Sequence, residues 1–173
     1  NSHSVLFADD RYFYIRTDRN APNNKMVRVP IDRPQESNWE DLIPETKEVL
    51  SPSIAGKYLF ANYLKDATSK VMQYDFSGKH IRDIQLPGVG SAYGFNEKSS
   101  ADVLYYGFMS YTTPYTIYKL DIESGASSLY IKPDVKFNPD DYESKQVFYP
   151  SKDGTKIPMV ITHKKGLTLN GKN

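Results

Sequence analysis

The 173-residue chain contains no cysteine, no long apolar run and no excess of charge of either sign. Without cysteine, the chain cannot form a disulfide framework, a thiolate metal site or a cysteine nucleophile. The net charge is +1, which gives no electrostatic reason to expect nucleic acid as a partner. No apolar run approaches the length of about 18 residues that a membrane-spanning helix needs. We therefore expect neither a nucleic-acid nor a membrane partner, and the composition fits a cytoplasmic or a periplasmic protein.

Aromatic residues are plentiful, with 14 Tyr and 8 Phe against a single Trp. Aromatic and β-branched side chains favour strands, and a hydrophobic fraction of 39% is sufficient for a packed core. The chain starts with Asn1 rather than Met, which is typical of an excised segment or a processed product. We therefore expect a strand-rich fold in a chain that is part of a longer one.

A repeat of about 45 residues runs through most of the chain. Each unit holds an aromatic run, then a second apolar segment that ends in Asp, and then a short third segment that ends in Pro. The aromatic runs are Tyr12–Thr17, Tyr58–Tyr63 and Leu104–Met109, whose first residues lie 46 and 46 positions apart. The Asp landmarks are Asp32, Asp75 and Asp121, and the Pro landmarks are Pro44, Pro87 and Pro133, both spaced by 43 and 46 positions.

A weaker strand pattern precedes each aromatic run, at residues 5–8, 49–55 and 92–96. Four strands in about 45 residues is the length of one blade of a β-propeller. Turn signals at Gly56, residues 75–78 and residues 121–125 separate the strands. We therefore predict an all-β partial propeller. Its four-stranded antiparallel blades span about 1–47, 48–88 and 89–133, and the aromatic runs are inner strands packed face to face.

The repeat ends at Pro133, and residues 134–145 are predicted to be a linker because residues 134–141 are rich in Pro and Asp. Beyond it, the strand patterns at 146–149 and 157–161 flank Asp153-Gly154, a strong signal for a hairpin turn. Residues 146–173 therefore start a new unit with a C-terminal hairpin, followed by a polar and basic tail.

The sequence offers no convincing catalytic, cofactor-binding or metal-binding residue. The nearest approach to a serine nucleophile is Ser91 in Gly90–Gly94, but it stands one position too early for a G-x-S-x-G elbow. We interpret Ser91 as part of a turn between blades. The histidines His3, His80 and His163 have no partner at metal-ligand spacing. The prediction is that catalytic, cofactor and metal sites are all absent.

Three further patterns are interpreted as local structure. Gly88–Gly94 approaches the dinucleotide fingerprint, but its third glycine comes one position late and no helix pattern follows, which indicates a loop. Ser37–Glu40 matches a capping box, and we expect a single helical turn or a plain loop there. The pairs Asp9-Asp10 and Asp140-Asp141 lie in polar turns without an apolar pocket to raise a carboxyl pKa, so we expect solvated turns.

Gln146–Gly166 resembles the segment where chains of the prolyl oligopeptidase family leave the propeller and enter the α/β-hydrolase domain. Residues 17–23, 39–45 and 110–114 are similar to the later blades of the same family, in the same order. This resemblance implies a serine endopeptidase that cuts short peptides on the carboxyl side of proline. In that family a seven-bladed propeller filters access to the active site. The family's catalytic Ser, Asp and His would lie beyond Asn173, so none is assigned here and the fragment itself is expected to be inactive.

Two alternatives stay open at this point. One is a β-propeller binding module with no catalytic role, and the other is a peptidase of the related oligopeptidase B type. The hairpin at Asp153-Gly154 favours a peptidase, because a free-standing binding propeller has no use for an unfinished strand pair. Short proline-containing peptides are then the expected partners of the full-length protein.

A three-blade arc would also leave the outer faces of its first and last blades bare. Large exposed apolar faces mark contact surfaces, and an unpaired strand edge can add a second one. The sequence therefore predicts self-association through these faces, together with the edge of Ile157–Ile161.

Overall fold

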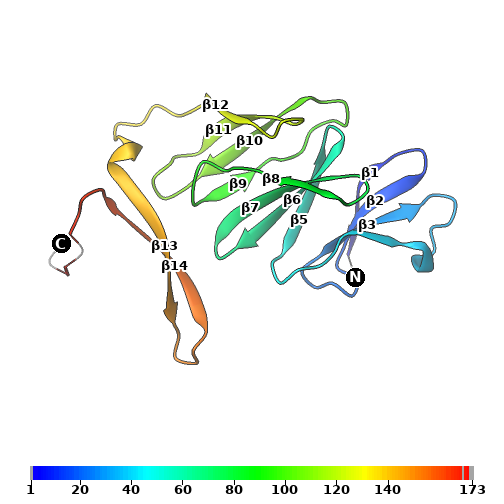
Figure 1. The fold of residues 1–173 in the computed structure, drawn as a ribbon, viewed down its shortest axis with the longest axis horizontal. Coiled ribbons are helices and arrows are strands. Elements are labelled where there is room, and N and C mark those ends of the chain that lie inside the picture. The colour runs from blue at the N-terminus through cyan, green and yellow to red at the C-terminus, as the bar shows by residue number, and fades with distance from the viewer. Residues whose placement is uncertain (1, 169, 172–173) are drawn as a thin grey trace.

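The computed structural model describes residues 2–168 and 170–171, which form strands and two short 3-10 turns. Three four-stranded antiparallel sheets stack face to face, and a two-stranded hairpin projects beyond the last of them (Figure 1). The predicted all-β partial propeller with three four-stranded blades and a C-terminal hairpin is confirmed. In the described part of the chain, no helix is long and apolar enough to cross a membrane.

Within each sheet, strands that follow one another in sequence are neighbours in space. The first sheet consists of β1 (His3–Ala8), β2 (Tyr12–Thr17), β3 (Lys25–Pro30) and β4 (Glu40–Ile43). The second consists of β5 (Leu50–Ala55), β6 (Tyr58–Lys65), β7 (Thr68–Asp75) and β8 (His80–Asp83). The third consists of β9 (Ser91–Tyr93), β10 (Val103–Met109), β11 (Thr116–Asp121) and β12 (Ser127–Ile131). The hairpin pairs β13 (Tyr142–Pro150) with β14 (Lys156–Lys164), and the 3-10 turns are η1 (Glu36–Asn38) and η2 (Pro139–Asp141).

The aromatic runs are strands β2, β6 and β10, as predicted, and each lies between two other strands of its sheet. In two of the sheets, an Asp side chain at the end of a strand holds the turn that follows it. Asp75 Oδ1 accepts hydrogen bonds from the backbone N–H of Ser77 (2.8 Å) and of Lys79 (3.0 Å). Asp121 Oδ1 accepts one from Ser124 N–H (2.8 Å) in the same way. An Asp that holds the backbone just after it favours a tight reversal of the chain. The Asp landmarks of the second and third repeats therefore close hairpins.

The first repeat uses its landmark differently. β3 ends at Pro30, so Asp32 lies beyond the strand and pairs with the neighbouring Arg33 at 3.4 Å. This side chain closes no comparable turn in the structure.

Some predicted boundaries were wrong. The tight Asp75–Lys79 turn lets pairing begin at His80, so β8 ends at Asp83, whereas the sequence pattern predicts a third segment that runs up to Pro87. Ser91 starts strand β9 and is not in a turn. η1 is the expected single helical turn, but its N-cap is Gln35 and no side chain caps it. β13 starts at Tyr142, inside the segment predicted as a linker, because its pairing with β14 extends to Lys164.

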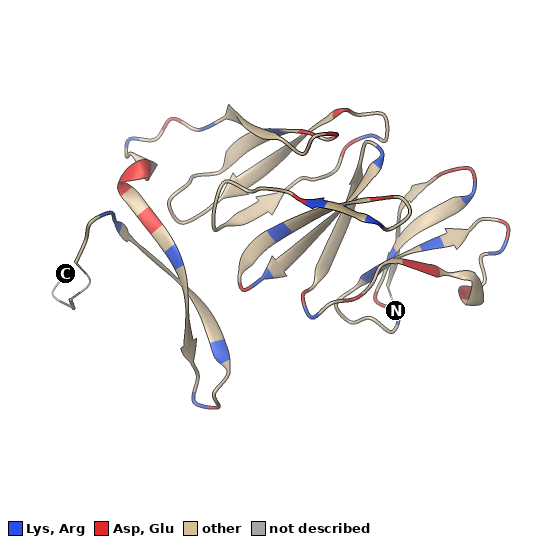
Figure 2. Ribbon diagram, in the orientation of Figure 1, with Lys and Arg blue, Asp and Glu red and all other residues tan. Residues whose placement is uncertain are grey.

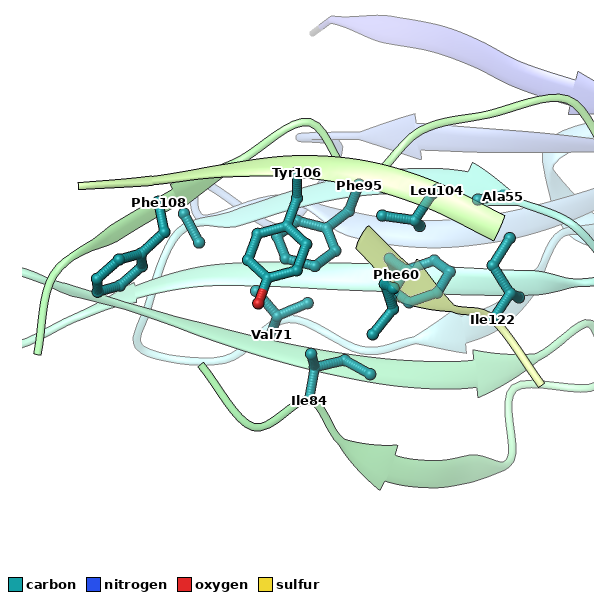
Figure 3. Close-up of a cluster of buried hydrophobic side chains, with 11 residues drawn as sticks. Ala55, Phe60, Val71, Ile84, Phe95, Leu104, Tyr106, Phe108 and Ile122 are labelled. Atoms are coloured by element: carbon teal, nitrogen blue, oxygen red, sulfur yellow. The ribbon is translucent and has the colours of Figure 1, made fainter. Parts of the chain in front are cut away.

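The core consists of apolar contacts between stacked sheets. Between the second and third sheets, Phe60 lies against Phe95, which stacks on Tyr106 with ring centroids 4.7 Å apart (Figure 3). In β10, Leu104, Tyr106 and Phe108 are buried while Tyr105 and Met109 are exposed, which is the alternation expected of a pleated strand. Burial of apolar area contributes about 25 cal/mol per Å², so these interfaces supply the main stabilisation. The predicted face-to-face packing is confirmed.

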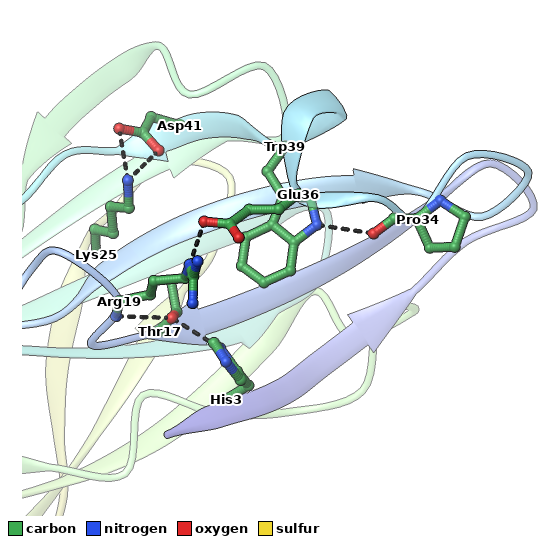
Figure 4. Close-up of polar contacts among 8 residues, drawn as sticks. All are labelled: His3, Thr17, Arg19, Lys25, Pro34, Glu36, Trp39 and Asp41. Atoms are coloured by element: carbon green, nitrogen blue, oxygen red, sulfur yellow. Dashed lines mark hydrogen bonds and ion pairs between the residues drawn. The ribbon is translucent and has the colours of Figure 1, made fainter. Parts of the chain in front are cut away.

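The outer face of the first sheet is not bare, contrary to the sequence-based expectation. Ile15, Val27 and Val29 on this face are 9%, 0% and 2% exposed because Trp39 packs against them. The Trp39 indole N–H donates to Pro34 O (3.0 Å), and the ring meets His3 edge-on (Figure 4). Among the apolar residues of this face, Val5 stays largely exposed. The loop from β3 to β4 thus shields one end of the stack.

Candidate functional site

An uncharged groove of about 420 Å³ lies between the second and third sheets. Its walls come from β5, β6 and the start of β7 on one side and from β9 on the other. The polar residues that line it are Ser51, Ser53, Asn62, Ser69, Ser91, Tyr93 and Asn96. All of its lining residues lie in the described part of the chain, and none is charged or a histidine. Such a groove can accept neutral hydrogen-bonding groups.

Several of these polar side chains hold β9 against the second sheet. Asn62 Nδ2 donates to Ala92 O (2.9 Å), and Ala92 N–H donates to Ser69 Oγ (2.9 Å). Ser53 Oγ donates to Phe95 O (2.5 Å). These bonds satisfy backbone groups that pairing within the third sheet leaves open. The hydroxyl and amide groups therefore position the groove wall.

Ser91 lies on this wall, at the start of β9. A serine hydroxyl becomes a nucleophile only when a base within hydrogen-bond reach takes its proton. No histidine, Asp, Glu or Lys is among the groove's lining residues, which all belong to the described chain. The lining of the groove therefore supplies no group that activates Ser91.

The three histidines lie in three separate places. His3 Nδ1 is 2.9 Å from Thr17 Oγ1, and His80 Nε2 is 2.9 Å from Asp83 Oδ1. His163 Nδ1 is 2.8 Å from Lys164 O. Across residues 2–168 and 170–171, no group of three His, Cys, Asp or Glu side chains could hold a metal ion.

The paired carboxylates are turn residues. Asp9 accepts hydrogen bonds from the backbone N–H of Arg11 (2.8 Å) and Tyr12 (2.7 Å) and from the Tyr14 hydroxyl (2.9 Å). Burial raises the pKa of Asp9, but these three hydrogen bonds outweigh it and hold the pKa below its usual value. The buried Tyr14 hydroxyl, donating to this carboxylate, has its pKa raised to about 12. Asp9 is thus held as a charged acceptor that shapes the β1–β2 turn.

The second pair lies in η2. Asn138 Oδ1 accepts from Asp140 N–H (3.2 Å), and Asn138 Nδ2 donates to Asp141 Oδ1 (3.0 Å). Asn138 therefore holds the Asp140 backbone and the Asp141 carboxylate, in a turn that contains no buried residue.

A polar contact between sheets was missed by sequence reasoning. The buried amide of Gln73 donates from Nε2 to Ile122 O (2.7 Å), across 49 positions of sequence. Beside it, Tyr58 Oη donates to Glu123 Oε2 (2.9 Å) and Arg82 Nη1 donates to Glu123 O (2.8 Å). The one feature of the sequence that could have indicated this contact is the polar Gln73 inside the apolar run Val71–Tyr74. This contact fixes the third sheet at the end opposite the groove.

Charges of both signs are interspersed over the described sheets and the hairpin (Figure 2). The ion pairs Lys25–Asp41 (2.8 Å) and Lys70–Asp83 (3.2 Å) each join an inner strand to the edge strand of the same sheet, and their carboxylates are about half exposed. Exposed pairs of this kind contribute about 0–1 kcal/mol each. They contribute little to stability compared with the apolar interfaces.

The carboxyl group of Asp153 should titrate far below its ordinary pKa of 3.8. Hydrogen bonds from the Ser151 hydroxyl and from Thr155 N–H (3.0 Å) stabilise its charged form and lower its pKa to about 2. A lowered folded-state pKa adds stability above the unfolded value, and that stability is lost as the pH falls through the folded value. We therefore expect this turn to lose support between about pH 4 and pH 2.

NMR titration of the Asp153 carboxyl carbon measures this directly. Ser151→Ala removes the largest cause of the shift and should raise the midpoint. A midpoint at the ordinary value in the unchanged chain would show that the two hydrogen bonds do not form in solution.

Comparison with known proteins places the chain in one family. The family model described as the prolyl oligopeptidase N-terminal β-propeller domain matches residues 3–133. A prolyl endopeptidase of Elizabethkingia miricola is 51% identical over 169 residues, which is 98% of this chain and 24% of that protein. A prolyl endopeptidase of Dictyostelium discoideum is 34% identical over 94% of this chain and 23% of its own length.

Solved structures agree with this comparison. Prolyl oligopeptidase B of Galerina marginata, in its apo form, superposes with a TM-score of 0.86 at 30% identity, covering 96% of this chain and 24% of that one. A structure from a study of two prolyl endopeptidases superposes with a TM-score of 0.83 at 43% identity, over 96% and 25% of the two chains. The chain thus spans about a quarter of the length of the relatives it matches.

Proposed function

Because the chain belongs to the prolyl oligopeptidase family and matches its N-terminal β-propeller domain, we propose that it is the propeller part of a serine endopeptidase that cuts short peptides after proline. The observation that carries the proposal is the 51% identity to a prolyl endopeptidase over 98% of the chain. In this function the propeller restricts which peptides reach the active site, and the catalytic groups come from outside these residues.

The proposed domain organisation follows the sheets. The blades correspond to residues 1–47, 48–88 and 89–133, and residues 134–145 form the linker, whose last four residues belong to strand β13. Residues 146–173 start the α/β-hydrolase domain. Two observations support this division: the family model ends at residue 133, and the hairpin β13–β14 forms a sheet separate from the third.

The chain alone should not hydrolyse proline-containing peptides. Acyl transfer needs a nucleophile, a base and an oxyanion site in one place, and the groove that holds Ser91 supplies no base. A fluorogenic peptide cleaved after proline provides the assay, with a full-length prolyl endopeptidase as the positive control. Product formation that scales with chain concentration and survives repurification would contradict the prediction.

A chimera tests the proposed function itself. Residues 1–173 would replace the matching quarter of the Elizabethkingia miricola prolyl endopeptidase. The chimera should cleave a short proline-containing peptide and leave a long unfolded protein intact. A folded chimera that cleaves neither would argue against the propeller role, and one that cleaves both would argue against the filtering role.

The reading frame after Asn173 separates the peptidase from a binding module. A peptidase requires a glycine-rich loop and, later, a G-x-S-x-G nucleophile elbow. A reading frame with neither feature would favour a binding module.

A further inference from the structure

A side-chain hydrogen bond crosses the proposed boundary between the propeller and the hydrolase domain. Gln146 of β13 donates from Nε2 to the backbone oxygen of Asp66, which lies 80 positions earlier in the chain. Asp66 belongs to the turn between β6 and β7 in the second sheet. The other hydrogen bonds and ion pairs of the described β13 and β14 side chains stay within the hairpin. The Gln146–Asp66 contact therefore joins the hairpin to the blades.

The turn that presents the Asp66 oxygen has a constrained backbone. Asp66 and Ala67 have left-handed conformations, with φ of 50° and 64°. A two-residue hairpin turn with positive φ at both central positions normally has glycine at the second, and alanine adopts this conformation only at an energetic cost. Strand pairing continues up to Lys65 and Thr68, and Thr68 Oγ1 donates to Lys65 O (3.0 Å). The turn therefore fixes the direction in which the Asp66 carbonyl group points.

The contact lies beside the groove between the second and third sheets. Leu64 and Ser69, which flank the turn on β6 and β7, both line this groove. All residues of β13 and β14 are described, and none of them is buried. In this chain, apolar packing therefore contributes little to the placement of the hairpin, and one polar contact is sufficient to decide it.

We propose that the β6–β7 turn is the docking point of the hairpin on the propeller, and that Gln146 is the positioning residue that sets the orientation of the hairpin. The proposal rests on the proposed function in one respect, because it takes the hairpin as the start of the hydrolase domain. In the whole enzyme, the contact would hold the first strands of that domain beside the groove. A backbone oxygen accepts from any donor, so the contact requires an N–H group at position 146 and no particular charge.

NMR of the full chain tests the contact. The side-chain amide protons of Gln146 should show nuclear Overhauser contacts to the backbone of Asp66 and Ala67. Residual dipolar couplings of the hairpin and of the second sheet should fit one common alignment. These measurements need no catalytic activity, so their outcome does not depend on the proposed function.

Three variants separate the donor from the rest of the side chain. Gln146→Met keeps the length of the side chain but removes the donor. The docking equilibrium should then shift about two- to tenfold toward the free hairpin, the effect of one neutral hydrogen bond, and the couplings of the hairpin should shrink. Gln146→Lys supplies a donor again and should restore them. Lys145→Met is the matched control, because neighbouring side chains of a strand point to opposite faces.

Three results would overturn the proposal. The first is an unchanged chain in which the Gln146 amide shows no contact with the turn. The second is a Gln146→Met variant with the hairpin couplings of the unchanged chain. The third is a Gln146→Lys variant that does not restore the couplings, because lost packing and not a lost donor would then explain the change.

The chimera with the Elizabethkingia miricola enzyme adds a functional measurement. Gln146→Met should raise the ratio of kcat/KM for a longer peptide to that for a short one by about two- to tenfold, because a hairpin that moves more freely restricts access less. Gln146→Lys should return the ratio to that of the unchanged chimera. An unchanged ratio in an active Gln146→Met chimera would contradict the positioning role. An unchanged chimera that is inactive would contradict the proposed function, while the NMR result still decides whether the hairpin docks through Gln146.

Discussion

Replacing Phe60 with alanine is expected to lower the free energy of unfolding by about 3–5 kcal/mol. Phe60 is completely buried between the second and third sheets, where its ring stacks on Phe95 with centroids 5.9 Å apart. The substitution removes apolar contact and leaves a cavity that both sheets border. Domains have a total stability of roughly 5–15 kcal/mol, so the loss is a large part of the whole.

Urea unfolding followed by tyrosine fluorescence and circular dichroism measures the change. Tyr111→Ala is the control, because a residue that is 78% exposed should change stability by no more than about 0.5 kcal/mol. A loss below about 1 kcal/mol for Phe60→Ala would mean that the second and third sheets do not pack as described.

Gly90→Ala is expected to be destabilising by about 1–3 kcal/mol, and more if the backbone cannot shift. A Cβ on Gly90 would lie 2.3 Å from the Met109 carbonyl oxygen and 2.7 Å from the Phe108 ring. The first of these contacts is with backbone, which cannot move aside as the tip of a side chain can. The expected damage therefore falls on the pairing of β9 with β10.

Gly88→Ala is the matched control two residues away. A Cβ on Gly88 meets no atom within 4 Å, and the glycine does not have a positive φ. This substitution should leave stability unchanged or raise it by about 0.4–1 kcal/mol, because alanine restricts the unfolded chain. Thermal unfolding of both variants compares them directly, and equal stabilities would show that the close approach at Gly90 is relieved in solution.

Strands whose signals are local could be predicted from the sequence. The aromatic runs of β2, β6 and β10 and the turns at Asp75 and Asp121 depend on alternating side chains and on Asp bonding the next few residues. Boundaries were less certain. β8 ends at Asp83, before the Pro87 landmark, and Ser91 belongs to a strand, because pairing with the neighbouring strand decides where each strand starts and stops.

The groove and the contact opposite it could not be predicted, because each joins residues from different repeats. Ser53 and Phe95 are separated by 42 positions, and Gln73 and Ile122 by 49. A serine or glutamine in an apolar run has the same local pattern whether it faces solvent or a distant carbonyl group. That the chain holds no catalytic residues stays a prediction. A catalytic site joins side chains that are distant in sequence, and the sequence alone does not show which of them meet.

The sequence by itself determined the repeat, the all-β class and the resemblance to one family, because period-two alternation and turn residues act over a few neighbouring positions. Only the tertiary structure decided that Trp39 covers the outer face of the first sheet, while Tyr105 and Tyr130 on the third sheet are about half exposed among the described residues. The first and third sheets have similar apolar strands, so composition alone does not predict which outer face is covered. The difference arises from the path of the β3–β4 loop, which folds back over its own sheet and buries Val27 and Val29.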